Sequence, residues 1–350
     1  MDDATLTQAT QATRGPVSQR KNLLFWTLLG ALLLVVGIAV LEIALRALYR
    51  EEEAAGDYFG FGGFIQDEEL GYRHAPGFNG TIYRRDIFDC PVSISPQGLR
   101  QSNFDAQMQY SKRLLVLGDS YVFGVGVKEE AIFASLAQPV LNFEGLGVIN
   151  GGQSGYCVTQ EVKFGMRLAQ TVKPSIIVLS LYPNNDIIGD YYKDYENVEV
   201  RHGHRLAKDR WLPIGVFDFV RSRSYAWMLL NVSLSRKRVE EQRKAFLRFA
   251  KDSTALAMQP TLTALAELHG FCRDNGIKLG VMLLPSAGKS LFDAPLKQAL
   301  NDEGIPVLDL GERKFGRKNY FQGDAHWNEN GHQKAAKYFV SFCQDLQKNS

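Results

Sequence analysis

Residues 117–126 read LGDSYVFGVG and directly follow the apolar run RLLVL at 113–117. A chain that leaves a buried strand needs Gly or Asp for its turn, and a helix starts well at Ser or Asp, so one explanation is purely structural. The other explanation is that Ser120 is a nucleophile displayed at the end of a strand. A serine attacks an acyl carbon when a base takes its proton and hydrogen-bond donors hold the oxyanion. The choice between the two depends on whether the sequence supplies these partners.

Polar segments that could supply them follow three other apolar runs. GGQSGYC comes after GVIN, YPNND comes after SIIVLSL, and GDAHWNENGH follows IPVLDL and its loop. They bring a flexible glycine loop, a carboxamide and a carboxylate–imidazole pair. If the apolar runs are parallel strands, their carboxyl ends share one edge of a sheet and these groups meet there. Acyl transfer requires this set of parts.

The alternation of strands and helices from residue 113 onward supports that arrangement. We predict strands at RLLVL, GVIN, SIIVLSL, IKLGVMLL and IPVLDL, with helices between them. One helix is expected to begin near Pro260, where a first-turn proline belongs, and to end before Gly276. Short apolar strands alternating with helices are typical of a parallel sheet covered on both faces.

With these four blocks in this order, the sequence resembles the SGNH/GDSL hydrolase superfamily over about residues 110–345. It is similar to bacterial members with one N-terminal membrane helix, and to the alginate and peptidoglycan O-acetylation proteins that share this domain. The resemblance implies an α/β fold, a flavodoxin-like three-layer α/β/α sandwich with a mainly five-stranded parallel sheet. It implies no cofactor and no metal.

The resemblance also implies a role for each matched residue. Ser120 in GDS is the nucleophile, His326 is its base, and Asp324 is the partner of His326. The oxyanion hole is formed by the backbone N–H groups of Ser120 and Gly155 and by the Asn185 side-chain amide. These donors and the base are all supplied by the protein itself.

Three further residues, Asp119, Asn184 and Ser286, are candidates for substrate contact. Two features depart from the family pattern. The third block reads Pro-Asn-Asn-Asp, where the family usually has a glycine two places before the asparagine. Asp324 and His326 form D-x-H instead of the common D-x-x-H, a spacing similar to that of the O-acetyltransferase-like branch. The role of Asp324 and the choice between hydrolysis and transfer therefore stay open here.

An uncharged stretch of nineteen residues, 23–41, is long enough to cross a bilayer as a helix. It is apolar all round and longer than a usual signal-peptide core, which disfavours a buried helix or a cleaved signal. The flanking Lys and Arg residues favour a cytoplasmic N-terminus with the body outside the cytoplasm. The predicted organisation is a disordered tail at 1–22, a transmembrane helix at 23–41, a juxtamembrane β-rich region at 42–112, and the SGNH-like domain at 113–348 with an insertion at 190–250.

Charge is distributed unevenly although the net charge is only +2. Residues 201–250 hold twelve Lys/Arg against four Asp/Glu, a local balance of 12 − 4 = +8, so the remainder carries 2 − 8 = −6. No overall basic excess points to nucleic acid. The basic insertion is either a solvated helix face or a site for an anionic glycan, a lipid-linked phosphate or the membrane surface, and it could act as a lid.

The four cysteines, Cys90, Cys157, Cys272 and Cys343, have no C-x-x-C spacing, which excludes a zinc-ribbon or thioredoxin-like site. If the body is extracytoplasmic, disulfides can form, and Cys272 with Cys343 is a conceivable pair. The pairing and the oligomeric state stay open.

Together these features predict a membrane-anchored extracytoplasmic serine esterase. By resemblance, it removes a small acyl group, acetyl above all, from a cell-envelope carbohydrate or another small ester through a Ser120 acyl-enzyme. One alternative is an O-acetyltransferase supplied with activated acyl groups by a membrane partner. Another is a non-catalytic glycan-binding assembly protein, against which the intact Ser120/His326 pair argues.

Overall fold

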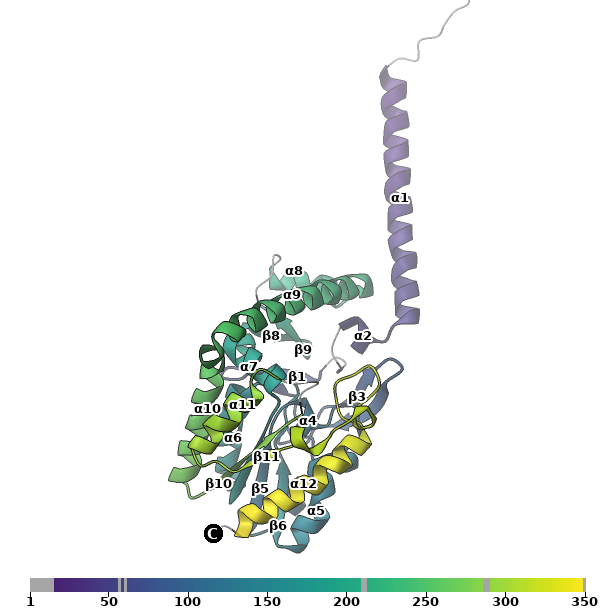
Figure 1. Ribbon diagram of the computed structural model, residues 1–350. Helices are drawn as coiled ribbons and strands as arrows, with labels where there is room; N and C mark the ends of the chain where they lie inside the picture. Colours follow the sequence, from purple (N-terminus) through teal and green to yellow (C-terminus); the bar gives the residue numbers. More distant parts are fainter. Residues whose placement is uncertain (1–15, 56–57, 60–61, 209–212, 286–289, 349–350) are drawn as a thin grey trace, which may run out of the picture.

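A computed structural model describes residues 16–55, 58–59, 62–208, 213–285 and 290–348. Figure 1 shows a body built on a parallel sheet, from which one long helix, α1 (Pro16–Leu48), extends. The strands of the sheet are β5 (Lys112–Leu117), β6 (Leu146–Asn150), β7 (Ile176–Leu181), β10 (Lys278–Leu283) and β11 (Val307–Asp309). All five strands coincide with the apolar runs from which they were predicted.

The sheet has the spatial order β11-β10-β7-β5-β6, and all of its pairings are parallel. β5 lies between its two chain neighbours, so that Leu114 pairs with Val148 on one side and Ile176 on the other. Numbered along the chain, the order is 2-1-3-4-5, the flavodoxin-like arrangement. In such sheets a crevice opens where the strand order reverses, at the carboxyl ends of the first and third strands. Here these strands are β5 and β7.

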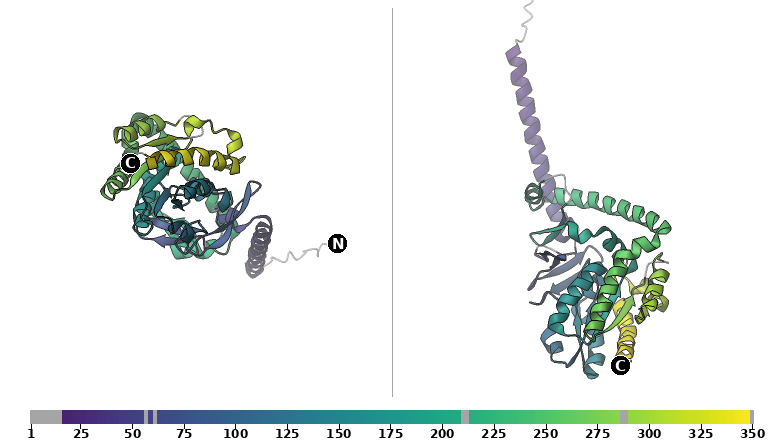
Figure 2. Two further views of the ribbon diagram at one scale, coloured as in Figure 1. Left: turned by 90° about the horizontal axis from the view of Figure 1, so that it is seen from below. Right: turned by 90° about the vertical axis from the view of Figure 1, so that its left-hand side faces the viewer.

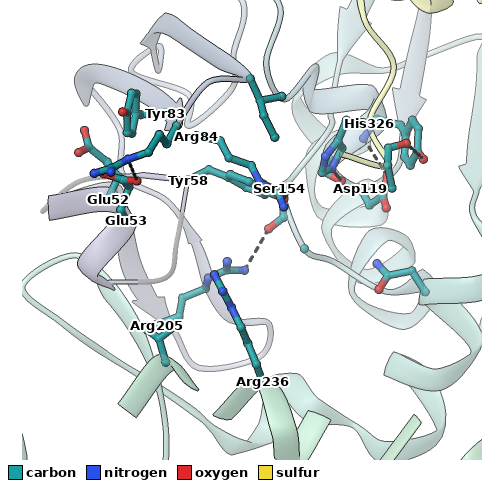
Figure 3. Close-up of a pocket in the computed structure, with 18 of the residues that line it drawn as sticks. Glu52, Glu53, Tyr58, Tyr83, Arg84, Asp119, Ser154, Arg205, Arg236 and His326 are labelled. Atoms are coloured by element: carbon teal, nitrogen blue, oxygen red, sulfur yellow. Dashed lines mark hydrogen bonds and ion pairs between the residues drawn. The ribbon is translucent and has the colours of Figure 1, made fainter. Parts of the chain in front are cut away.

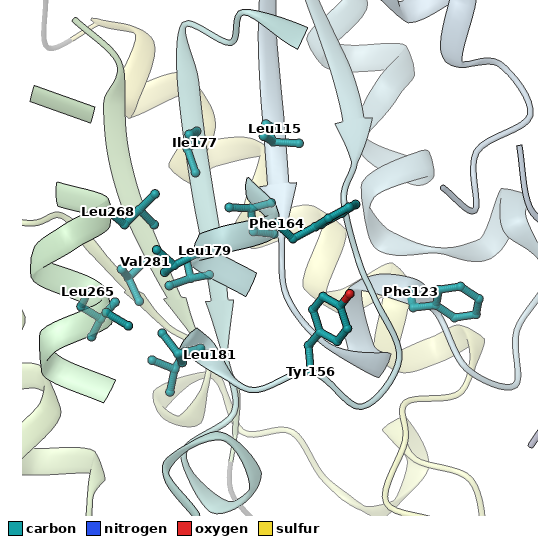
Figure 4. Close-up of a cluster of buried hydrophobic side chains, with 14 of the residues drawn as sticks. Leu115, Phe123, Tyr156, Phe164, Ile177, Leu179, Leu181, Leu265, Leu268 and Val281 are labelled. Carbon is teal, nitrogen blue, oxygen red and sulfur yellow. The ribbon is translucent and has the colours of Figure 1, made fainter. Parts of the chain in front are cut away.

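Helices cover both faces of the sheet, so the predicted three-layer α/β/α sandwich is confirmed (Figures 1 and 2). Side chains alternate along each strand, and Leu115 and Leu117 therefore enter one core while Leu114 and Val116 enter the other. The first core receives α6, α10 and α11, and Figure 4 shows part of it; the second receives α5 and α12. The helices of the body are α2 (Glu51–Ala55), α3 (Phe104–Met108), α4 (Ser120–Phe123), α5 (Phe133–Phe143), α6 (Val158–Val172), α7 (Pro183–Tyr192), α8 (Ile214–Arg221), α9 (Tyr225–Asp252), α10 (Thr254–Asp274), α11 (Asp293–Asp302) and α12 (Glu329–Lys348).

The β-rich region before the sheet forms two small antiparallel pairs. These are β1 (Phe64–Asp67) with β2 (Gly71–His74), and β3 (Asn79–Arg84) with β4 (Phe88–Ser93). Their apolar side chains, among them Phe59, Leu70 and Ile82, belong to the same buried core as Leu115 of β5. The region is therefore part of the body and has no hydrophobic core of its own within the described residues.

The segment predicted as an insertion contains a hairpin and two helices. The hairpin pairs β8 (Val198–Arg201) with β9 (His204–Ala207), and α8 and the long α9 follow it. α9 packs against α1, α2 and α10. In α1, the stretch Arg20–Leu48 is long and apolar enough to cross a membrane, and the body buries none of its most apolar part. The helix already includes residues 16–22, which were predicted as a disordered tail; residues 1–15 lie outside the described residues.

Two expectations of detail are wrong. α10 begins at Thr254, so Pro260 lies inside the helix rather than in its first turn. The start is displaced because Ala257 and Met258, which precede the proline, are buried in the core and continue the helical face.

The pair Cys272–Cys343 does not form, because Cys272 lies in the core on one face of the sheet and Cys343 in the core on the other. All four cysteines carry buried free thiols.

The loop after β6 leaves no room for a side chain at Gly152. A Cβ there would lie against the backbone nitrogen of Phe123 and 2.6 Å from the carbonyl carbon of Val122. We expect Gly152→Ala to lower the free energy of unfolding by about 1–3 kcal/mol, since both neighbours are backbone atoms that cannot turn away.

Gly270→Ala is the matched control, because Gly270 lies within α10 and has open space around its Cα. The helical propensity of Ala should make this variant more stable than the wild type by up to about 1 kcal/mol. Denaturation followed by circular dichroism measures both. Equal stability of the two variants would contradict the packing argument.

Candidate active site

Ser120 stands at the first position of α4, three residues after the end of β5. The preceding Asp119 caps this helix, because its Oδ1 accepts a hydrogen bond of 2.9 Å from the N–H of Tyr121. The cap fixes the turn, and α4 ends at Phe123, just before Gly124, whose φ of 81° is left-handed. The Ser120 side chain is thereby held at the carboxyl edge of the sheet, where the sequence predicted it.

His326 and Asp324 complete a hydrogen-bonded chain with Ser120. The Nε2 atom of His326 lies 2.8 Å from Ser120 Oγ, and its Nδ1 atom lies 2.6 Å from Asp324 Oδ1. The two pairs use opposite ring nitrogens, which is the arrangement that lets an imidazole accept a serine proton while a carboxylate orients it. No hydrogen bond joins His326 to Ser154, the neighbouring serine, in the described part of the chain.

The D-x-H spacing brings Asp324 into contact with both the ring and the backbone of His326. The same Oδ1 atom that meets Nδ1 also accepts a 2.8 Å hydrogen bond from the His326 backbone N–H. The other oxygen, Oδ2, pairs with the Arg84 guanidinium and accepts a hydrogen bond of 3.2 Å from the Tyr58 hydroxyl. Burial opposes ionisation of Asp324, but the hydrogen bonds from His326 and the charge of Arg84 outweigh it and lower the pKa of this carboxyl. Asp324 is therefore a fixed anion beside the imidazole.

Ser120, Gly155 and Asn185, the residues predicted to form the oxyanion hole, line one cavity together with His326. The backbone N–H groups of Ser120 and Gly155 donate no hydrogen bond within the described residues, so both are available to a ligand. Burial raises the pKa of Asp119 to about 6, although its interaction with the neighbouring Asn185 side chain acts in the opposite direction. Asp119, predicted to contact the substrate, is also among the residues that line this cavity, although it is only 1% exposed.

The loop that carries Gly155 is fastened by side chains of β2. The Tyr72 hydroxyl donates to the Gly155 carbonyl at 2.7 Å, and the Ser154 N–H donates to His74 Nε2 at 3.1 Å. Burial lowers the pKa of His74 to about 3, which keeps the ring neutral and able to accept this bond. Gly155 itself has a φ of 81°, and a Cβ there would lie 2.5 Å from the Arg205 guanidinium. The left-handed φ makes glycine the favoured residue here, whereas the Arg205 group is the far end of a flexible side chain and can shift.

The cavity has a volume of about 860 Å³ and is bounded by three parts of the chain (Figure 3). The first is the set of segments that follow the strands of the sheet and carry Ser120 and His326. The second is the N-terminal β-rich region, which contributes Tyr58 and Arg84, and the third is α9, which contributes Arg236. A second cavity of about 740 Å³ shares Gly155 and Asn185 with the first and includes Asn184 in its lining. Ser286, the third predicted contact residue, lies outside the described residues.

Four site residues were not identified from the sequence. These are Tyr58 and Arg84, which contact Asp324, and Tyr72 and His74, which hold the Gly155 loop. They precede the sheet and belong to no block that resembles the family. The only signal in the sequence was the alternating strand pattern of their region, which does not reveal what its side chains touch.

Beneath the site lies a group of buried carboxyls. Glu161 on α6 is 1% exposed, and neither of its side-chain oxygens has a hydrogen-bond partner within the described residues. Burial, together with the nearby carboxyls of Asp186 and Asp119, raises the pKa of Glu161 well above its ordinary 4.5. The folded protein therefore holds a proton at Glu161 at pH values where the unfolded chain has released it.

Because folding takes up this proton, the free energy of unfolding falls as the pH rises above 4.5, the ordinary pKa of a Glu carboxyl in the unfolded chain. Glu161→Gln keeps the shape without the ionisation, so it should match the wild type near pH 4.5 and become progressively more stable than it toward pH 7. Denaturation midpoints over this range measure the effect. Glu267→Gln, at an exposed position of α10, should leave the pH dependence unchanged. A parallel pH dependence of Glu161→Gln and the wild type would show that Glu161 ionises normally.

Comparison with known proteins finds no matching family model and no matching curated protein. Among solved structures, a lipolytic protein of the G-D-S-L family from Desulfitobacterium hafniense is 12% identical, with a TM-score of 0.39, over 66% of this chain and 99% of that one. The psychrotrophic esterase EstA from Pseudoalteromonas is 13% identical, with a TM-score of 0.42, over 68% and 100%. A two-domain esterase active on acetylated mannans is 11% identical, with a TM-score of 0.40, over 70% and 52%.

Proposed function

We propose that this protein is an SGNH-type serine esterase anchored in a membrane by α1. The observation that carries the proposal is the hydrogen-bonded chain from Ser120 through His326 to Asp324, which opens into a cavity lined by Gly155 and Asn185. A binding module has no use for a serine hydroxyl paired with an oriented imidazole. The arrangement matches the needs of acyl transfer.

In the proposed reaction, His326 Nε2 takes the proton of Ser120 as Oγ attacks an ester carbonyl. The new oxyanion accepts hydrogen bonds from the N–H groups of Ser120 and Gly155 and from the Asn185 amide. His326 then gives its proton to the alkoxide oxygen of the departing alcohol as its bond to the acyl carbon breaks, leaving an acyl-enzyme on Ser120. A water molecule, deprotonated by His326, attacks the acyl carbon, and His326 returns this proton to Ser120 Oγ as the bond to the acyl group breaks and the acid is released. Asp324 stays ionised throughout and stabilises the imidazolium.

The substrate we propose is a carbohydrate that carries a small acyl group, acetyl in the first place. The family resemblance of the sequence supports this class. The size of the two adjoining cavities, about 860 and 740 Å³, supports it as well, because an acetyl group alone would occupy a small part of them. The remaining volume is suited to the sugar part of the ester, flanked by Asn184 and Asn185.

The proposed location is a membrane crossed once by α1, with the N-terminus in the cytoplasm and the body outside it. Length and apolar composition of the stretch Arg20–Leu48 support the anchor. The charges that flank the apolar run support the orientation.

O-acetyl transfer is a second candidate, favoured by the D-x-H spacing of Asp324 and His326. The acyl-enzyme would form in the same way, and a sugar hydroxyl would replace water in the second step. Such an enzyme needs an activated acyl donor, which a membrane partner would deliver. Mass spectrometry of oligosaccharide acceptors for added acetyl groups distinguishes transfer from hydrolysis.

The first test is hydrolysis of p-nitrophenyl acetate by the detergent-solubilised full chain. Ser120→Ala and His326→Ala should each lower kcat/KM at least about 1,000-fold, because neither the nucleophile nor the base can be replaced by its neighbours. Ser154→Ala serves as the matched control and should retain activity. Circular dichroism checks that each variant is folded. If Ser154→Ala abolishes turnover while Ser120→Ala retains it, the assignment of the nucleophile is wrong.

The Asn185 amide is tested by kinetics on the same substrate. Asn185→Ala should lower kcat about 100- to 1,000-fold with little change in KM, because the amide contacts the oxyanion only as it forms. Asn185→Asp should be at least as damaging, since a carboxylate repels the developing negative charge. A rise in KM at unchanged kcat would instead identify Asn185 as a substrate-binding residue.

A further inference from the structure

The N-terminus of α9 is tied to α1 at the point where the apolar stretch ends. Glu42 is the first charged residue after residues 23–41. Its carboxylate accepts hydrogen bonds from Ser224 Oγ at 3.0 Å and from the Tyr225 N–H at 2.8 Å. One turn later, the Arg46 guanidinium lies 4.8 Å from the centre of the Tyr225 ring. If α1 spans a membrane, α9 therefore begins at its surface.

From this point α9 crosses the body instead of continuing along α1. Figures 1 and 2 place α8 and α9 on the side of the body from which α1 extends, with the sheet on their other side. The face of α9 that carries Met228 and Phe246 is buried against the body. The opposite face is the part of the body nearest to the plane in which α1 would enter the bilayer.

This outward surface of α8 and α9 carries large apolar side chains. Phe219 of α8 is 59% exposed, and Leu230 and Leu234, one turn apart on α9, are 53% and 57% exposed. The positions that continue the same face of α9, Lys237 and Arg238, are exposed and basic. Exposed leucines and aromatics beside Lys and Arg are typical of helices that lie in the interface of a bilayer.

We infer that α8 and the first half of α9 lie in the headgroup layer of a membrane that contains anionic lipids. The inference rests on the proposed role of α1 as the anchor, with which this surface is continuous. A bilayer fits it better than a second copy of the chain, because two such basic faces would repel each other. The acidic pair Glu240 and Glu241 follows directly, and it marks where the contact with anionic lipid ends.

The inner side of the same helix lines the catalytic cavity. Leu229, Val232 and Arg236 contribute to the cavity wall, and Figure 3 shows Arg236 reaching into it from α9. Because an α-helix with its side chains is about 10 Å thick, the cavity lies only about that far from the proposed bilayer surface. An ester attached to a membrane-bound carrier would reach Ser120 more readily than one far from the surface.

The test places an environment-sensitive fluorophore on single introduced cysteines of the full chain in lipid vesicles. The probe sites are Phe219→Cys and Leu234→Cys, and the control is Phe143→Cys, which is 94% exposed at the end of α5. The four native thiols are buried. In vesicles of phosphatidylcholine and phosphatidylglycerol, a lipid nitroxide near the headgroup should quench the probes at 219 and 234 but not at 143. Lys237→Glu with Arg238→Glu should reduce quenching at 234 on these vesicles and hardly affect it on neutral ones.

A further probe at Leu32→Cys, in the middle of the stretch 23–41, reports the anchor by itself when the nitroxide is carried on the lipid acyl chains instead of near the headgroup. Suppose that the probe at 32 is quenched while the probes at 219 and 234 are quenched no more than the probe at 143. The inference is then overturned, and the anchor stands. A lack of quenching at 32 instead overturns the anchor. Self-quenching at 234 that does not respond to lipid nitroxide would assign this face to a second copy and overturn the inference as well. Hydrolysis of p-nitrophenyl acetate by each labelled chain tests the proposed esterase separately.

Discussion

The Asp324 carboxylate joins parts of the chain that lie far apart in the sequence. One oxygen holds both the ring and the backbone of His326, and the other meets Arg84 and Tyr58 from the N-terminal region. A carboxylate that is largely removed from water must be satisfied by partners of this kind, because an unpaired buried charge is costly. The position of the imidazole beside Ser120 depends on this one group.

The N-terminal β-rich region is consequently a structural part of the site. Arg84 and Tyr58 contact Asp324, whereas Tyr72 and His74 hold the loop that carries Gly155. The region shares its buried core with the parallel sheet, so it cannot move as a separate body without exposing that core. In the proposed mechanism this rigidity favours catalysis, because preorganised donors and a preoriented base stabilise a transition state most when nothing has to rearrange.

The proposed membrane contact gives α9 two roles on opposite faces. Its inner face lines the cavity that contains Ser120 and His326, and its outer face carries exposed leucines and basic residues toward the proposed bilayer. Glu42 couples these roles, because it links the start of α9 to the last turns of α1. The basic balance of residues 201–250, which is unusual for the chain as a whole, acquires a physical reason if this surface meets anionic lipid.

The sequence by itself determined the parallel sheet, its strands and the meeting of Ser120, Gly155, Asn185 and His326. Strand patterns are local, and parallel strands must end on the same edge, so residues that follow them converge. Only the tertiary structure decided the contacts of Arg84 and Tyr58, the start of α10 before Pro260 and the separation of Cys272 from Cys343. Each of these depends on which faces pack together across long stretches of chain, and periodicity along the sequence carries no information about that.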